Sequence, residues 1–241
     1  MKIFLTGASG FIGRHLAAAL RARGHEVIAA GRDGGPHVQA VDFSVDFSPE
    51  LWAQRLRGVE VEVVINAVGI IRERGRQTFE ALHHRAPAAL FAGAAAAGVR
   101  RIVQISALGA GAEARSRYFR SKHAADEALA ALPVDWVIAQ PSLVFGPGGG
   151  SARLFTLLAS LPVTPAPAGA GAVQPIHVDD VVEALVSLVE SPQPLRRRVA
   201  LVGPAPVSFR QFLADLREAM GLRPAPAVPI PQWMMRLSAS V

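Results

Sequence analysis

The chain has 241 residues, of which 51% are hydrophobic and 18% charged, with a formal net charge of +6 and no cysteine. This length and composition allow one α/β unit with a buried core and a small appendage. The lack of cysteine excludes disulfides and thiolate metal sites. Because the arginines are dispersed and no basic segment is interleaved with aromatic residues, we expect no nucleic-acid partner.

The apolar segments and the two ends of the chain indicate where in the cell we expect the protein. The N-terminus passes directly into an apolar segment without a basic flank or cleavage site, so we expect no signal peptide and a cytoplasmic protein. The most apolar run, residues 86–99, is too short to span a bilayer. Near the C-terminus, the proline-rich segment 224–231 precedes an apolar one with Trp233, Met234 and Leu237. For this tail a lid over the site, a homodimer contact and a membrane contact all remain open.

The N-terminal segment carries a nucleotide-binding pattern. Residues 2–6 predict a buried strand, residues 14–23 have the apolar spacing of a helix, and residues 26–30 predict a second strand. A glycine-rich turn between strand and helix lets backbone N–H groups approach a pyrophosphate at the helix N-terminus. A tight turn without a ligand is the alternative. The candidate cofactor-binding residues of this turn are Gly7, Ser9, Gly10, Phe11, Ile12 and Gly13.

The only tyrosine, Tyr118, stands four residues before Lys122, one of only two lysines. A spacing of four places both side chains on one face of a helix. An ammonium group beside a phenol favours the phenolate and lowers its pKa, so Tyr118 is a candidate general acid/base. The alternative is a buried aromatic residue with a solvated lysine nearby.

These patterns resemble the short-chain dehydrogenase/reductase superfamily, in its extended and atypical branches. Asn66 to Gly69 resembles the family's NAG-like turn, residues 140–147 its RPxxVFGPG segment, and residues 177–181 its HVDDV segment. Ser106 ends a predicted strand where the family places its catalytic hydroxyl. The resemblance extends from residue 2 to about residue 220. The chain is similar to the subgroup that includes the NAD(P)H-binding accessory subunit of respiratory complex I and bacterial epimerase/dehydratase-like proteins.

The resemblance implies an oxidoreductase that transfers hydride at a carbonyl or alcohol carbon of an unidentified small molecule. Tyr118 would move the proton, Lys122 would hold the nicotinamide ribose, and Ser106 would bind the substrate oxygen. Further implied cofactor-binding residues are Ala67, Val68, Gly69, Lys122, Pro141, Ser142 and Leu143. A non-catalytic nucleotide-binding structural or redox-sensing module and a sugar-nucleotide epimerase/dehydratase are the alternatives.

Other polar residues receive more modest interpretations. Asn66 either positions backbone near the cofactor or caps a turn. His83 and His84 are adjacent and lack metal-ligand spacing, so we expect them to be structural or solvent-facing. The resemblance makes His177 part of a packing segment, and no metal site is predicted.

The choice of cofactor depends on the end of the second strand. An acidic residue there selects NAD, whereas an arginine accommodates the 2′-phosphate of NADP. Arg32 therefore favours NADP(H) over NAD(H), Arg14 could add a second contact, and Asp33 could take the ribose role if the turn is shifted. Asp42 and Phe43 resemble the family's adenine-contacting pair, with a turn residue as the alternative for Asp42.

The alternation of strands and helices predicts an α/β fold with a Rossmann-type, doubly wound parallel sheet and a small C-terminal substrate subdomain. We expect residues 1–145 to form the dinucleotide-binding domain, with a helix at 178–190 packing back on it. Residues 146–177 and 191–241 would form the substrate-side subdomain and tail, including a strand at 198–202 and a helix at 208–220 with Ser208 as its N-cap. One long helix is predicted over 79–97.

Overall fold

The computed structural model describes residues 1–32, 34–35, 38–167 and 171–230. The chain divides into two compact units. Unit 1 comprises Met1–Pro141 and Asp179–Leu201, and unit 2 comprises Ser142–Val178 and Val202–Val241. Asp33 and the tail residues Trp233, Met234 and Leu237 lie outside the described residues. No helix among the described residues is long and apolar enough to cross a bilayer.

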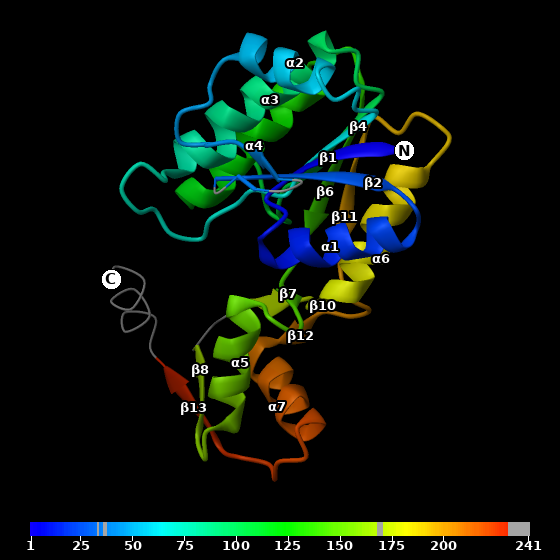
Figure 1. The fold of residues 1–241 in the computed structure, drawn as a ribbon. Helices are drawn as coiled ribbons and strands as arrows, with labels where there is room; N and C mark the ends of the chain where they lie inside the picture. Colours follow the sequence, from blue (N-terminus) through cyan, green and yellow to red (C-terminus); the bar gives the residue numbers. More distant parts are fainter. Residues whose placement is uncertain (33, 36–37, 168–170, 231–241) are drawn as a thin grey trace. The chain divides into compact units, whose positions relative to one another are not determined.

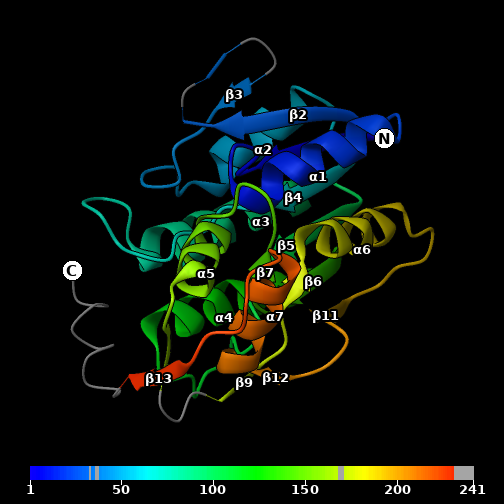
Figure 2. The same ribbon diagram turned by 90° about the horizontal axis from the view of Figure 1, so that it is seen from below.

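Unit 1 is built on a seven-stranded sheet in which all neighbouring strands are parallel (Figure 1). The strand order is β11-β6-β5-β4-β1-β2-β3, with β3 at the edge beside β2 (Figure 2). The strands are β1 (Lys2–Thr6), β2 (Glu26–Gly31), β3 (Val38–Ala40), β4 (Val63–Asn66), β5 (Arg101–Ile105), β6 (Asp135–Pro141) and β11 (Arg197–Leu201). The order reverses between β1 and β4, as in a Rossmann fold, and this confirms the predicted fold class.

Helices cover both faces of this sheet. On one face lie α2 (Pro49–Arg57), α3 (Ala86–Ala96) and α4 (Arg117–Ala130), and on the other lie α1 (Phe11–Ala22) and α6 (Val178–Glu190) (Figure 1). The main core lies under α2, α3 and α4, where Phe4, Trp52 and Phe91 are fully buried. Burying such side chains is the dominant favourable term in folding. The strands of the sheet therefore pack against an apolar layer formed with α2, α3 and α4.

Serine caps set where several helices begin. Ser48 Oγ accepts a hydrogen bond from Leu51 N at 3.2 Å, and Ser116 Oγ accepts one from Phe119 N at 3.2 Å. Such caps satisfy an N–H group that has no partner inside the helix. Ser116 therefore fixes the start of the helix that carries Tyr118 and Lys122.

The segment predicted as one helix over 79–97 consists of two parts. Residues Glu80–Arg85 form a π-helical turn, η1, and α3 begins only at Ala86. Pro87 explains the change, because proline has no N–H to donate to the carbonyl of His83 four residues earlier. Short π-helical turns are frequent at functional sites, and this one carries His83.

The strand predicted at 198–202 belongs to the central sheet rather than to the appendage. β11 pairs in parallel with β6, with Val199 opposite Ala139 and Leu201 opposite Pro141. The open edge of β6 offers a full row of backbone donors and acceptors, which explains why this strand adds to it. The chain therefore returns to unit 1 at α6 and remains in it to the end of β11.

The described residues of unit 2 contain two helices, α5 (Gly150–Ser160) and α7 (Phe209–Ala219), of which α5 was not predicted. A small core of Phe155, Ala159, Phe212 and Leu213 joins them. The predicted N-cap of α7 is confirmed, because Ser208 Oγ accepts from Gln211 N at 3.0 Å. Three two-stranded pairs complete the unit: β7 (Val144–Phe145) with β10 (Ile176–His177), β9 (Ala172–Val173) with β12 (Val207–Ser208), and β8 (Thr164–Pro167) with β13 (Ala227–Ile230).

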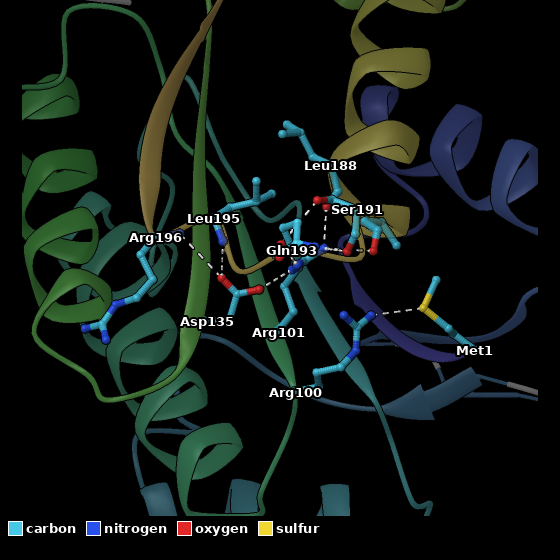
Figure 3. Close-up of polar contacts among 10 residues, drawn as sticks. Met1, Arg100, Arg101, Asp135, Leu188, Ser191, Gln193, Leu195 and Arg196 are labelled. Atoms are coloured by element: carbon cyan, nitrogen blue, oxygen red, sulfur yellow. Dashed lines mark hydrogen bonds and ion pairs between the residues drawn. The ribbon is translucent and has the colours of Figure 1, made fainter.

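The fully buried Arg101 of β5 binds the second segment of unit 1, Asp179–Leu201, to the sheet (Figure 3). Arg101 Nε donates to Asp135 Oδ2 at 2.5 Å. Its two terminal nitrogens donate to the carbonyls of Leu188, Val189, Ser191 and Gln193 at 2.8–3.1 Å. These are carbonyls at and beyond the C-terminus of α6, which lack partners inside the helix and favour a nearby cation.

Replacing Arg101 with methionine should lower the free energy of unfolding by about 3–5 kcal/mol, because it leaves the partly buried carboxylate of Asp135 and several carbonyls without their cation. The matched control is Arg100→Met, since Arg100 is exposed and donates only to Met1 Sδ among the contacts drawn in Figure 3. We expect that control to change stability by about 0.5 kcal/mol or less. Urea denaturation measures both, and equal losses would contradict the anchoring role.

Candidate active site

The glycine turn lies where β1, α1 and the end of β4 meet. A Cβ atom at Gly13 would lie 2.0 Å from Gly7 O, and one at Gly7, where φ is +72°, would lie 2.6 Å from the carbonyl carbon of Ala67. No side chain fits at either position. The turn therefore brings the first N–H groups of α1 to the carboxyl ends of the strands, where open parallel sheets bind ligands.

A cavity of about 200 Å³ opens beside this turn. Nine predicted cofactor-binding residues line it: Gly7, Ser9, Gly10, Arg32, Asp42, Phe43, Ala67, Val68 and Gly69. It is smaller than the roughly 300–1,000 Å³ of whole-ligand pockets, so it has the size for part of a dinucleotide. Phe11, Ile12 and Gly13 lie in the first turn of α1, outside this lining.

Seven further lining residues were not among the predicted cofactor-binding residues: Ala30, Gly31, Val41, Ser44, Ile70, Gln77 and Leu82. Ala30, Val41 and Ser44 flank predicted residues, so the strand ends could have indicated them. Gln77 comes from the segment that leads into η1, and Leu82 lies within η1. No spacing or motif in the sequence marks that segment as part of a ligand site.

Asp42 is an ionised turn residue in this cavity. Its Oδ1 accepts from both Ser44 Oγ at 2.7 Å and Ser44 N at 2.8 Å. These two hydrogen bonds, with smaller contributions from the charges of Arg32 and Arg76, lower the pKa of the Asp42 carboxyl. The turn-capping interpretation of Asp42 therefore holds alongside its place in the lining.

Tyr118 and Lys122 lie on α4 against the segment that follows β4. Lys122 is buried, and its Nζ donates to Ile105 O at 3.0 Å and to Val68 O at 3.4 Å. A Cβ atom at Gly69 would lie 3.3 Å from the same Nζ. The ammonium group thus contacts Val68 and Gly69, two residues that line the cavity.

The pKa values of these two side chains differ from the expectation. Burial raises the pKa of the Tyr118 phenol, so the predicted lowering by Lys122 is wrong for this structure. Burial lowers the pKa of Lys122 to about 8, and the charge of Asp126 opposes this effect. Desolvation therefore sets the direction of both shifts, and the phenol is protonated at neutral pH.

His83 is a buried structural residue that positions Tyr118. Its Nε2 accepts from Ile70 N at 2.9 Å, and its Nδ1 lies 3.0 Å from Ser121 Oγ. Because the Ser121 hydroxyl donates to Tyr118 O at 2.8 Å, Nδ1 carries the proton. Burial, with the nearby charge of Lys122, lowers the pKa of His83 to about 3 and keeps the ring neutral. The ring also meets Tyr118 edge-on, with centroids 5.3 Å apart.

Ser106 is bonded to a carboxylate that the sequence analysis did not single out. Ser106 Oγ donates to Asp126 Oδ2 at 2.6 Å, and both side chains are buried. Burial raises the pKa of Asp126 to about 6, although the Ser106 hydrogen bond and the charge of Lys122 favour the ionised form. The predicted contact between Ser106 and substrate remains a prediction.

Hydrogen-bonded polar side chains connect the ends of β1, β4 and β5. Asn66 Oδ1 accepts from Thr6 Oγ1 at 2.7 Å and from Val68 N at 3.2 Å, and Asn66 Nδ2 donates to Gln104 Oε1 at 2.8 Å. All three side chains are fully buried. Asn66 therefore both caps the turn and holds its backbone beside the cavity.

The remaining predicted cofactor-binding residues lie where the sequence passes from unit 1 to unit 2. Pro141 ends β6 in unit 1, whereas Ser142 and Leu143 begin unit 2. There the Ser142 hydroxyl donates to Gln174 O, and Leu143 O accepts from Ile176 N at 3.0 Å. Unit 2 also has a cavity of its own, about 910 Å³, lined by the glycine-rich loop 145–150 and by side chains of α5 and α7.

Comparison with known proteins gives the family. Residues 3–203 match the model of the NAD dependent epimerase/dehydratase family. A ceramide reductase from Caulobacter vibrioides is 32% identical over 197 residues, which cover 79% of this chain and 61% of that protein. The mitochondrial NADH dehydrogenase (ubiquinone) 1 alpha subcomplex subunit 9 from Arabidopsis thaliana is 30% identical over 199 residues, covering 76% of this chain and 49% of the subunit.

Solved structures agree on the fold. The UDP-glucuronic acid 4-epimerase from Bacillus cereus, determined in complex with NAD, has a TM-score of 0.78 at 18% identity, covering 96% of this chain and 87% of that chain. MoeE5 in complex with UDP-glucuronic acid and NAD has a TM-score of 0.74 at 24% identity, with coverages of 95% and 86%. The chain belongs to the NAD dependent epimerase/dehydratase family, within the extended short-chain dehydrogenases/reductases, and is a homologue of the complex I subunit.

Proposed function

We propose that this chain is an NADP(H)-dependent oxidoreductase that transfers hydride at a carbonyl or alcohol carbon, with Tyr118 as the acid/base. The observation that carries the proposal is the contact of Lys122 Nζ with Val68 and Gly69 of the nucleotide cavity. The only tyrosine lies one helical turn before Lys122 on α4, and its ring meets that of His83, which accepts a hydrogen bond from Ile70 N next to Gly69. The relative named ceramide reductase supports a reductive reaction.

The residues present fit a dinucleotide. The glycine turn offers backbone N–H groups to a pyrophosphate without a side chain in the way, and the cavity beside it offers a carboxylate, an arginine and apolar walls. Arg32 is exposed at the end of β2, where its guanidinium is suited to a 2′-phosphate. We therefore favour NADP(H), with Lys122 assigned to the ribose next to the nicotinamide.

The protonation of the site favours reduction of a carbonyl group. A bound nicotinamide would supply the hydride to the carbonyl carbon. The Tyr118 phenol, protonated because burial raises its pKa, gives its proton to the carbonyl oxygen as the alcohol forms. The buried Lys122 ammonium stabilises the phenolate that remains, and solvent then returns the proton.

Two other functions have specific support. The homology to the complex I subunit, together with a Ser106 hydroxyl bonded to Asp126, favours a nucleotide-binding module without turnover. The likeness in fold to UDP-sugar epimerases bound to NAD, with a cavity of about 910 Å³ in unit 2, favours an epimerase or dehydratase. Assays of NADPH oxidation with a panel of carbonyl compounds, and of product formation from UDP-sugars, separate these alternatives, because an epimerase or dehydratase returns the hydride and oxidises no NADPH overall.

The first test concerns cofactor selection. Arg32→Ala should weaken NADPH binding by about tenfold or more and leave NADH binding nearly unchanged, because it removes a charge-assisted contact to the phosphate. The control is Arg76→Ala, since the charge of Arg76 also acts on Asp42 but Arg76 does not line the cavity. Titration calorimetry with both cofactors measures the effect, and equal losses for NADPH and NADH would rule out the assignment.

The second test concerns the proton transfer. Tyr118→Phe should reduce kcat by at least about 100-fold while cofactor affinity is retained, because only the transferable proton is lost. Lys122→Ala should impair both kcat and cofactor affinity. Steady-state kinetics on a confirmed carbonyl substrate, with NADPH fluorescence for binding, make the comparison. Full activity of the Tyr118→Phe variant would show that another group moves the proton.

A further inference from the structure

Lys122, Asp126 and Ser106 form a buried group of three side chains on α4 and at the end of β5. Lys122 and Asp126 are four residues apart on α4, so their side chains share one face of the helix. Ser106 Oγ reaches Asp126 Oδ2 at 2.6 Å from the residue after β5. The exposed fractions are 4% for Lys122 and Ser106 and 0% for Asp126, so solvent screens none of these charges.

Burial disfavours the protonated form of an amine, and a nearby negative charge opposes this effect. The two main-chain carbonyls that Lys122 contacts supply dipoles but no charge. The ring of His83 from η1 also lies near Lys122 and is neutral, and the charge that acts on Lys122 is that of the Asp126 carboxylate. Asp126 is therefore the one source of negative charge among the described groups that face the amine.

The Ser106 hydroxyl in turn keeps Asp126 ionised. Among the groups that favour the carboxylate, Ser106 ranks ahead of Lys122, Gln140 and Arg198. Asp126 Oδ1 has no hydrogen-bond partner within the described part of the chain, and the hydrogen bond from Ser106 favours the carboxylate more than the one from Gln140 does. Loss of the Ser106 hydroxyl should therefore favour the protonated carboxyl group and remove the counter-charge of Lys122.

We propose that Asp126 is a positioning residue that keeps Lys122 charged, and that Ser106 acts by orienting this carboxylate rather than by touching substrate. The proposal rests on the proposed function, in which the charged Lys122 holds the cofactor ribose and stabilises the tyrosine anion. It gives a role to the one buried carboxylate beside the acid/base pair.

The composition of the chain allows a direct test that needs no substrate. The sequence has only two lysines, so ¹⁵N-lysine labelling gives one side-chain NMR signal for Lys122 and one for Lys2 as an internal reference. We expect a Lys122 pKa near 8 in the unaltered protein, as burial predicts. Asp126→Asn should lower it by about one to three units, and Ser106→Ala should lower it by a smaller amount.

The matched control is Glu127→Gln on the same helix. Glu127 is exposed and pairs with Arg198 and His123. Its replacement by glutamine removes one negative charge, as Asp126→Asn does, but one residue further along the helix. This variant should leave the Lys122 pKa unchanged. With a confirmed substrate, one of the apparent pKa values in the pH profile of kcat/KM should be that of Lys122. In each variant, we expect this kinetic pKa to shift by as many units as the Lys122 pKa measured by NMR.

Two outcomes would overturn the proposal. One is an unchanged Lys122 pKa in both the Asp126→Asn and Ser106→Ala variants. The other is a Ser106→Ala variant that loses kcat equally at every pH with its Lys122 titration unmoved, because Ser106 would then act on the substrate oxygen. If no substrate is turned over, the proposed function fails while the NMR titration still decides the role of Asp126.

Stability against pH gives an independent measurement of the same carboxyl group. Folding raises the pKa of Asp126 from 3.8 to about 6, so the folded state holds more protons than the unfolded state between these values. The contribution of Asp126 to stability is therefore complete below pH 3.8 and is lost as the pH rises through about 6. The stability of the unaltered protein relative to Asp126→Asn should decrease across this window. A flat difference would mean that Asp126 is not desolvated as described.

Discussion

The buried ammonium group of Lys122 is the interaction on which the site depends. Through Val68 O and Ile105 O it joins the ends of β4 and β5 to α4, and the nearby Asp126, whose charge favours the ammonium form, links α4 to Ser106. A desolvated cation is costly, so these acceptors must stay in place for the fold to tolerate it. The same requirement fixes the position of the amine beside the nucleotide cavity, which is what a group that holds a cofactor needs.

Much of this arrangement could be predicted because its signals are local. The glycine spacing requires only that Gly7 and Gly13 meet across one tight turn, and the spacing of Tyr118 and Lys122 requires only that residues 117–130 form a helix. The serine cap of α7 is likewise set within four residues. The alternation of strands and helices then leaves few topologies, so the parallel sheet followed from the same local evidence.

The parts that were missed depend on residues far apart in sequence. Arg101 reads as an ordinary basic residue until its contacts with carbonyls about 90 positions later are known. The link from Ser106 to Asp126 and the tautomer of His83 need the packing of α4 and η1 against the strand ends. The Tyr118 pKa was predicted in the wrong direction because the spacing of four implies proximity to Lys122 but says nothing about desolvation.

The distribution of buried polar groups gives the last step of the argument. Thr6, Asn66, Gln104, Ser106, Lys122 and Asp126 are all buried at or beside the carboxyl ends of β1, β4 and β5. Apolar residues of similar size would stabilise a sheet edge at least as well, because burying polar groups costs free energy even when they are paired. Proteins concentrate such costly arrangements where function requires them. The polar cluster is therefore an argument for a functional site at these strand ends, and most of its members lie on strands and on α4.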